Sequence, residues 1–295
     1  SLGATTTGHS NVAIGRDAML SNLTGDGNTA LGYKALFTNN GSTPDFNTAI
    51  GRQALYSNTT GTVNTAVGLN TSYSNTTGTC NVAIGRNALY TTTTGAKNVA
   101  IGAAALYTAS TASDNTAVGD QALYATTTGA YNTSIGSSSG KAVTDGASNV
   151  FVGYNAGLAT TTADANVAIG SDSFKVNTVG HSNVVVGESA MAANTEADNG
   201  TAVGFQALMA NTTGNNNTAI GSGSSVATTT GTGNVSVGQA SFVTNTTGDG
   251  NVAIGRGSLY SNTSANEITA VGTCALFSNT TGADKVAVGF CALSC

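Results

Sequence analysis

Asn81-Val82-Ala83-Ile84-Gly85 is one of seventeen variants of a five-residue motif that recurs through the 295-residue chain. The same motif occurs as Asn11-Val12-Ala13-Ile14-Gly15 and as Asn251-Val252-Ala253-Ile254-Gly255. Successive motifs begin seventeen residues apart, except for one interval that contains two additional residues. A fixed period of this length indicates a short structural unit stacked on itself. The chain is therefore predicted to be a solenoid and not a globule.

The composition of each repeat position predicts the path of one coil. With the Asn as position 0, position +3 is Ile, Val or Leu and position +4 is Gly in all seventeen repeats. Position +1 is Val or Thr, and +8 is Leu, Met or Phe in thirteen repeats. Residues +1 to +3 fit a short strand, the glycine fits a corner, and a second short strand is expected to carry +8 inward. No helical period of 3.6 residues is present. The predicted fold is all-β, a parallel β-solenoid of about seventeen coils of 17 residues.

The repeats favour a single continuous solenoid domain over residues 1–295, with incomplete coils at both ends. The extra residues lie within 39–46, which contains Pro44, the only proline. Insertions of this kind belong in surface turns, because an added strand residue would reverse the faces of those that follow. Incomplete coils suggest either a piece of a longer protein or end-to-end stacking of protomers.

A ribbon of small residues is predicted along the outside of the solenoid. If the +1 and +3 side chains fill the interior, position +2 lies on the outer face, and it is Ala in thirteen repeats. Soluble monomers rarely leave such an apolar ribbon uncovered, so chains are expected to associate through it as a parallel homotrimer. The predicted interface residues are Ala13, Ala30, Ala49, Ala66, Ala83, Ala100 and Ala117.

The motif resembles that of a known family. Asn-Val-Ala-Ile-Gly followed by a small residue at +7, as in Ala18, Ala88 and Ser258, is similar to the YadA-like head repeat of trimeric autotransporter adhesins. Related repeats occur in trimeric bacteriophage tail fibres. The resemblance covers residues 11–295 and implies a left-handed parallel β-roll in an extracellular homotrimer that works in attachment. The coil is longer here than in the usual adhesin head, with an enlarged Thr-rich turn.

Position +9 forms an aromatic column. Its consecutive members are Tyr56, Tyr73, Tyr90, Tyr107 and Tyr124. One interpretation is an exposed strip that stacks on sugars or other surface ligands. The other, which we favour, is a structural ladder whose rings stack on one another and cover the edge of the roll. The hydroxyl groups would be exposed in either case, so this column is the predicted contact surface for a cell-surface glycan or protein receptor.

Three other columns have structural interpretations. Position 0 is Asn in fourteen repeats, and stacked amides can hydrogen-bond along such a column. Position +12 is Thr or Ser from Thr59 to Thr280; turn chemistry explains these residues better than ice binding, for which Thr-x-Thr spacing is typical. Cys274 and Cys291 both occupy +6, so they are predicted to lie about 4.8 Å apart on adjacent coils. With Cys295 they could form a disulfide within or between chains, or remain partly buried thiols.

The composition argues against several function classes. Only 8% of residues are charged, 9 basic and 14 acidic, and no basic cluster suggests a nucleic-acid partner. No run of eighteen apolar residues predicts a membrane span, and no signal peptide is visible. No nucleophile–base pair, carboxylate pair or phosphate-binding loop stands out, so neither an enzyme nor a cofactor is expected. The two histidines, His9 and His181, lie in separate turns, which argues against a metal site.

The combined hypothesis is an extracellular trimeric fibre or adhesin shaft or head that attaches to a host or neighbouring cell. The protein would then be located on a bacterial cell surface, in an extracellular filament or in a virion tail. The first alternative is a structural subunit of an extracellular filament, built by end-to-end stacking without a receptor. An ice-binding solenoid is the third hypothesis, after the fibre and the filament.

Overall fold

The computed structural model describes residues 7–40 and 45–294. This part of the chain contains seventeen strands of three residues each and no helix, so no membrane-spanning helix is present in it. The chain divides into two compact units, Ser1–Ser148 and Asn149–Cys295. Each unit is a parallel β-solenoid, as the repeats predict. Continuity of one solenoid over residues 1–295, the hand of the roll and the trimer remain predictions.

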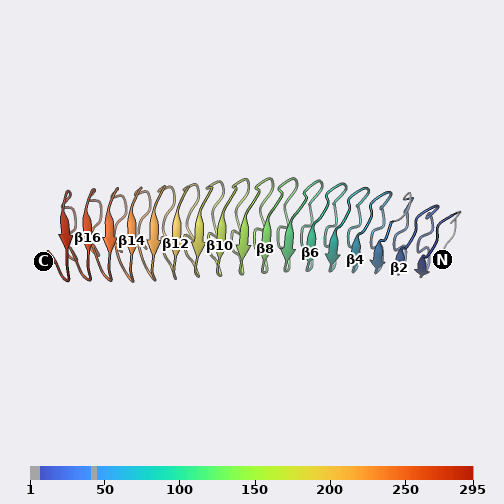
Figure 1. Cartoon of the computed structure of the whole chain (residues 1–295), viewed down its shortest axis with the longest axis horizontal. Coiled ribbons are helices and arrows are strands. Elements are labelled where there is room, and N and C mark those ends of the chain that lie inside the picture. The colour runs from blue at the N-terminus through green and yellow to red at the C-terminus, as the bar shows by residue number, and fades with distance from the viewer. Residues whose placement is uncertain (1–6, 41–44, 295) are drawn as a thin grey trace. The chain divides into compact units, whose positions relative to one another are not determined.

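Each strand occupies positions +1 to +3 of one repeat, and within a unit each strand pairs in parallel with the next (Figure 1). The first unit contains β1 (Val12–Ile14), β2 (Thr29–Leu31), β3 (Thr48–Ile50), β4 (Thr65–Val67), β5 (Val82–Ile84), β6 (Val99–Ile101), β7 (Thr116–Val118) and β8 (Thr133–Ile135). The second contains β9 (Val150–Val152), β10 (Val167–Ile169), β11 (Val184–Val186), β12 (Thr201–Val203), β13 (Thr218–Ile220), β14 (Val235–Val237), β15 (Val252–Ile254), β16 (Thr269–Val271) and β17 (Val286–Val288).

Like positions stack in register from coil to coil. Ile84 pairs with Ile101, and Ile101 pairs with Val118. The insertion leaves this register intact, because Thr29 pairs with Thr48 across the longer interval. That the insertion lies in a turn stays a prediction, because Pro44 and residues 41–43 lie outside the described residues.

The predicted direction of the strand faces is wrong. The +2 alanines of the proposed interface ribbon point into the core: Ala30, Ala49, Ala66, Ala83, Ala100 and Ala117 are fully buried within the chain, and Ala13 packs against the core. The +1 and +3 side chains point outward instead. Ala fits the inward position because the opposite wall, formed by +7 alanines and +8 leucines such as Ala54 and Leu55, lies close to it. The ribbon cannot form an interface between chains.

The predicted second strand of each coil is also absent from the described residues. Residues at +6 and +8 have left-handed backbones, as at Asn70 (φ 53°) and Leu55 (φ 49°), which no strand has. Such φ values cost about 1–2 kcal/mol each for residues other than glycine. Backbone hydrogen bonds between coils offset this cost. The backbone N–H of Asn70 donates to the Arg52 carbonyl (2.9 Å), and the backbone N–H of Leu55 donates to the Thr71 carbonyl (3.0 Å). The inter-coil ladder thus continues through the corners, and +8 still points inward.

The invariant glycine at +4 is explained by a close backbone approach. Gly85 has a φ of 131°, and a Cβ added there would lie 2.5 Å from the carbonyl oxygen of Gly102 in the next coil. No real Cβ atom tolerates this contact, and only glycine adopts this φ without strain. The glycine column therefore sets how tightly the coils stack.

Two columns of buried amides run through the core. The side-chain oxygen of Asn81 accepts from the backbone amide of Asn98 (2.9 Å), and the Asn98 side chain donates to the Ala112 carbonyl (2.8 Å). The predicted Asn ladder is thus confirmed. A second column, at +11, was not recognised in the sequence: Asn75 donates to Asn58 (2.8 Å). Both columns satisfy turn carbonyls that would otherwise be buried without partners.

Candidate functional site

One regular feature of the outer surface is a column of apolar side chains. We define the outer stripe as the outward side chains at +1 and +3 of the strands. In the first unit, Ile84 is 39% exposed and Ile135 is 43% exposed; in the second, Ile220 is 41% exposed. Apolar side chains exposed singly are ordinary, but a continuous column of them is characteristic of an interaction surface. The sequence showed that +1 and +3 share a face, and only the structure shows that this face is outside.

The aromatic column forms a continuous stack in the first unit. Phe37 stacks on Tyr56 with ring centroids 5.1 Å apart, and Tyr56 stacks on Tyr73 at 4.9 Å. Tyr73–Tyr90, Tyr90–Tyr107 and Tyr107–Tyr124 follow at 5.3, 5.1 and 5.1 Å. The planes of all these pairs are within 15° of parallel. The ladder interpretation is confirmed in its geometry.

This stacking limits the chemistry of the column. Each internal ring has both faces covered by neighbouring rings, so a sugar cannot stack on them, and the outer edges and hydroxyl groups remain for contact. Burial raises the pKa of the Tyr73 hydroxyl above its ordinary value of 10.0, and the neighbouring Tyr56 and Tyr90 raise it further. Burial and the adjacent Tyr124 and Tyr90 raise the pKa of Tyr107 as well. The hydroxyl groups of Tyr73 and Tyr107 therefore stay protonated at physiological pH.

Cationic side chains gather at one end of the aromatic stack. The Lys34 ammonium lies 5.1 Å from the centroid of Phe37 and 5.9 Å from that of Tyr56. The guanidinium groups of Arg16 and Arg52 lie 5.6 and 5.9 Å from the ring of Tyr33. The sequence signal for this cluster is the set of basic and aromatic residues at +5 and +6 of adjacent repeats, and it was not recognised before the structure.

The hydroxyl groups of the +12 threonine column donate hydrogen bonds to backbone carbonyl groups of the next coil. Thr76 Oγ1 donates to the carbonyl of Thr93 (3.0 Å), and Thr178 Oγ1 donates to that of Thr195 (3.0 Å). A hydroxyl proton used in this way is not offered to solvent, so turn chemistry accounts for these residues.

The structure does not join the cysteines that the sequence suggested for a disulfide. Cys274 is a free thiol, so its predicted bond to Cys291 is not made, and Cys295 lies outside the described residues. The Cys80 thiol is free and exposed. Residues 7–40 and 45–294 include no group of three or more His, Cys, Asp or Glu side chains suited to a metal ion.

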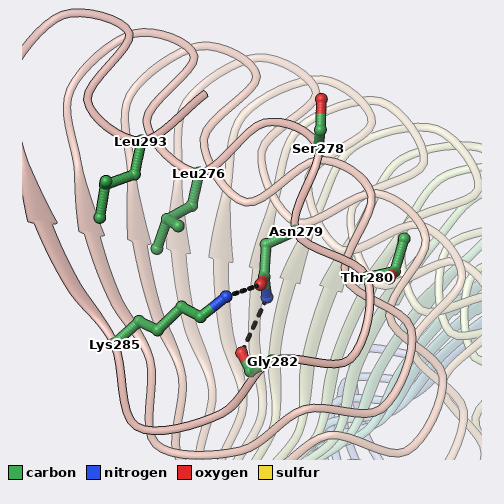
Figure 2. Close-up of a pocket in the computed structure, with 7 residues that line it drawn as sticks. All are labelled: Leu276, Ser278, Asn279, Thr280, Gly282, Lys285 and Leu293. Atoms are coloured by element: carbon green, nitrogen blue, oxygen red, sulfur yellow. Dashed lines mark hydrogen bonds between the residues drawn. The ribbon is translucent and has the colours of Figure 1, made fainter. Parts of the chain in front are cut away.

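A pocket of about 370 Å³ opens in the second unit (Figure 2). Its lining comprises Leu276, Ser278, Asn279, Thr280, Gly282, Lys285 and Leu293. Lys285 replaces the Asn of the buried ladder, and its ammonium donates to Asn279 Oδ1 at 2.6 Å. The Asn279 amide in turn donates to the Gly282 carbonyl at 3.0 Å. The Lys285 ammonium therefore pairs with the side-chain oxygen of Asn279, and the lining residues of the pocket include no carboxylate or imidazole.

Comparison of the chain with protein-family models and with curated proteins finds no match.

Proposed function

We propose that this protein is part of an extracellular fibre or adhesin that assembles as a homotrimer and attaches to a host or neighbouring cell surface. The observation that carries the proposal is the outer stripe, in which +3 is Ile, Val or Leu in every coil of both units and +1 is Val or Thr. It replaces the alanine ribbon as the surface through which copies of the chain associate.

The stripe is suited to another copy of itself. Its residues repeat once per coil, so a parallel copy presents the same spacing, and contacts made at one coil recur at the next. Burying the remaining exposed surface of an Ile or Val contributes about 1 kcal/mol per side chain. Summed over the +3 side chains of one unit, this is on the order of 8 kcal/mol, which is comparable to the cost of association of about 4–15 kcal/mol.

The aromatic column supports the attachment role. Its hydroxyl groups form a straight row that can donate to and accept from glycan hydroxyls or a protein backbone. The charged fraction of the chain is low, so this contact would depend little on salt.

A structural filament without a receptor is the second candidate. The observation that favours it is the coverage of ring faces within the aromatic column, which gives these residues a stabilising role without a ligand. Electron micrographs of the purified protein distinguish the two, because discrete rods support the fibre and indefinite threads support the filament.

The association is tested by sedimentation equilibrium. The expected mass is three times that of the chain, and a folded sample that remains monomeric at micromolar concentration contradicts the proposal. Binding of the full chain to intact cells, compared with a variant in which Tyr73, Tyr90 and Tyr107 are replaced by Ala, tests the attachment surface.

A further inference from the structure

The second unit contains a hollow of about 300 Å³ on its outer surface. Its lining comes from three consecutive coils and comprises Gln239, Ala240, Arg256, Gly257, Tyr260, Cys274 and Phe277. None of these residues is acidic. The volume lies at the small end of the range of about 300–1,000 Å³ for ligand pockets, which suits a single monosaccharide unit.

Small side chains at one repeat position leave room for the hollow. At +6 about half of the coils carry larger polar residues such as Gln53, Asn87 and Gln121, whereas this region has Ala240 and Gly257 in successive coils. A Cβ added at Gly257 would lie 3.6 Å from the Phe277 ring and 3.7 Å from Cys274 Sγ, which are ordinary contacts. A larger side chain at this position would therefore fill the hollow without a backbone clash.

The wall of the hollow is aromatic. Tyr260 and Phe277 stack with centroids 4.9 Å apart and planes 14° apart. Unlike the internal rings of the first unit, Tyr260 has a ring on one side only, because the preceding repeat carries Val243 at +9. Phe277 is 37% exposed. Apolar ring surface is thus accessible here in a way that the internal rings of the longer stack do not allow.

The polar groups complement an anion. Arg256 is exposed and makes no ion pair with the described residues. Its planar guanidinium matches a carboxylate in a bidentate contact. The amide of Gln239 supplies a donor and an acceptor for hydroxyl groups. The chain as a whole carries a net charge of −5, so this is a local reversal of its overall charge.

We infer that this hollow binds a carboxylated sugar unit, of the uronic or sialic acid class, within a surface glycan. The carboxylate pairs with Arg256, the hydroxyl groups bond to Gln239, and the C–H surface of the sugar packs against Tyr260 and Phe277. The inference rests on the proposed attachment role and names its ligand class.

The test uses the full chain and methyl glucuronide, with methyl glucoside as the neutral comparison, at millimolar concentration in saturation-transfer NMR. Glucuronide is expected to bind about tenfold or more tightly than glucoside, which corresponds to one charge-assisted contact. Gly257→Asn should abolish binding by filling the hollow. Gly223→Asn is the matched control, because Gly223 occupies +6 in another coil with the same φ of 64° and nothing within 4 Å. Arg256→Gln should weaken glucuronide binding about tenfold without lowering the thermal midpoint.

Absence of glucuronide binding, equal binding of glucoside, or binding that persists in Gly257→Asn overturns the inference. If cell attachment of the unaltered chain persists in those cases, the proposed function stands without this site. If glucuronide binds as described but the chain does not attach to cells, the attachment role fails and the sugar site remains.

Discussion

Phe151 and Gly157 share the space that Ala and Leu fill in most other coils. Phe151 occupies +2 and is fully buried, and a Cβ added at Gly157, which occupies +8, would lie 2.5 Å from the Phe151 ring carbons Cδ1 and Cε1. The two positions therefore face each other across the interior. The large and small residues have exchanged places in this coil while the total volume is conserved.

Phe151→Ala should lower the free energy of unfolding by about 3–5 kcal/mol, because it leaves a cavity beside a glycine. Gly157→Leu alone should also destabilise, since the added side chain collides with the ring. The double variant restores the common Ala/Leu arrangement, and Leu is compatible with a left-handed φ at +8, as at Leu55. Urea denaturation of the four proteins should show the double variant to be more stable than either single one. If the losses in free energy of unfolding of the two single variants simply added in the double variant, the side chains at +2 and +8 would not be in contact.

Gly85→Ala should destabilise severely, because the added Cβ would lie 2.5 Å from the Gly102 carbonyl oxygen at a φ of 131°. Gly223→Ala is the control: its φ is 64°, where Ala104 has a similar conformation, and nothing lies within 4 Å. Its expected cost is about 1 kcal/mol or less. Thermal denaturation of both variants checks this, and equal midpoints would show that close stacking does not require the glycine column.

Asn98→Ala should cost about 2–5 kcal/mol, because it removes partners from two buried groups at about 1–3 kcal/mol each. These groups are the backbone N–H of Asn115, which lies 3.1 Å from Asn98 Oδ1, and the carbonyl of Ala112, which lies 2.8 Å from Asn98 Nδ2. Lys97→Ala, at the adjacent exposed residue, should change the free energy of unfolding little. Similar losses for the two variants, measured by urea denaturation, would argue against the amide ladder as a stabilising element.

If the proposed trimer forms through the outer stripe, replacing Ile84 and Ile101 together by Lys should convert it to monomer without unfolding the chain, because both side chains point outward. Lysines in the outer stripe would bring desolvated like charges together between copies. The matched variant replaces Thr77 and Thr94, exposed turn residues, by Lys and should remain trimeric. Sedimentation equilibrium gives the mass and circular dichroism the fold. An unchanged mass in the Ile variant would remove the outer stripe as the association surface.

The stability of the first unit should fall as the pH rises above about 10. Burial and neighbouring tyrosines raise the folded-state pKa of Tyr73 and Tyr107, so the unfolded chain releases these protons first and unfolding is favoured there. The stabilisation is fully present below the unfolded-state pKa and is lost through the raised one. Replacing both by Phe keeps the stack, as Phe37 does, and should reduce the alkaline loss seen in thermal midpoints. An identical pH dependence in both proteins would contradict this.

The sequence by itself determined the period, the register and which residues share a face. The seventeen-residue interval predicts that Ile84, Ile101 and Val118 lie in one file, and stacking of parallel strands makes this unavoidable. The aromatic ladder and the Asn column follow for the same reason, since any residue repeated at one position meets its equivalent in the next coil.

Only the tertiary structure decided which face is inside. Alternation fixes that Ala83 lies opposite Val82 and Ile84, but either set could fill an interior of unknown width. The width is set by the opposite wall, whose path depends on the left-handed backbones at +6 and +8. Residues such as Leu55 at +8 carry no sequence signal for this conformation. The narrow interior that results favours Ala at +2, where Phe151 and Val185 are buried exceptions, and the +1 and +3 side chains form the outer stripe.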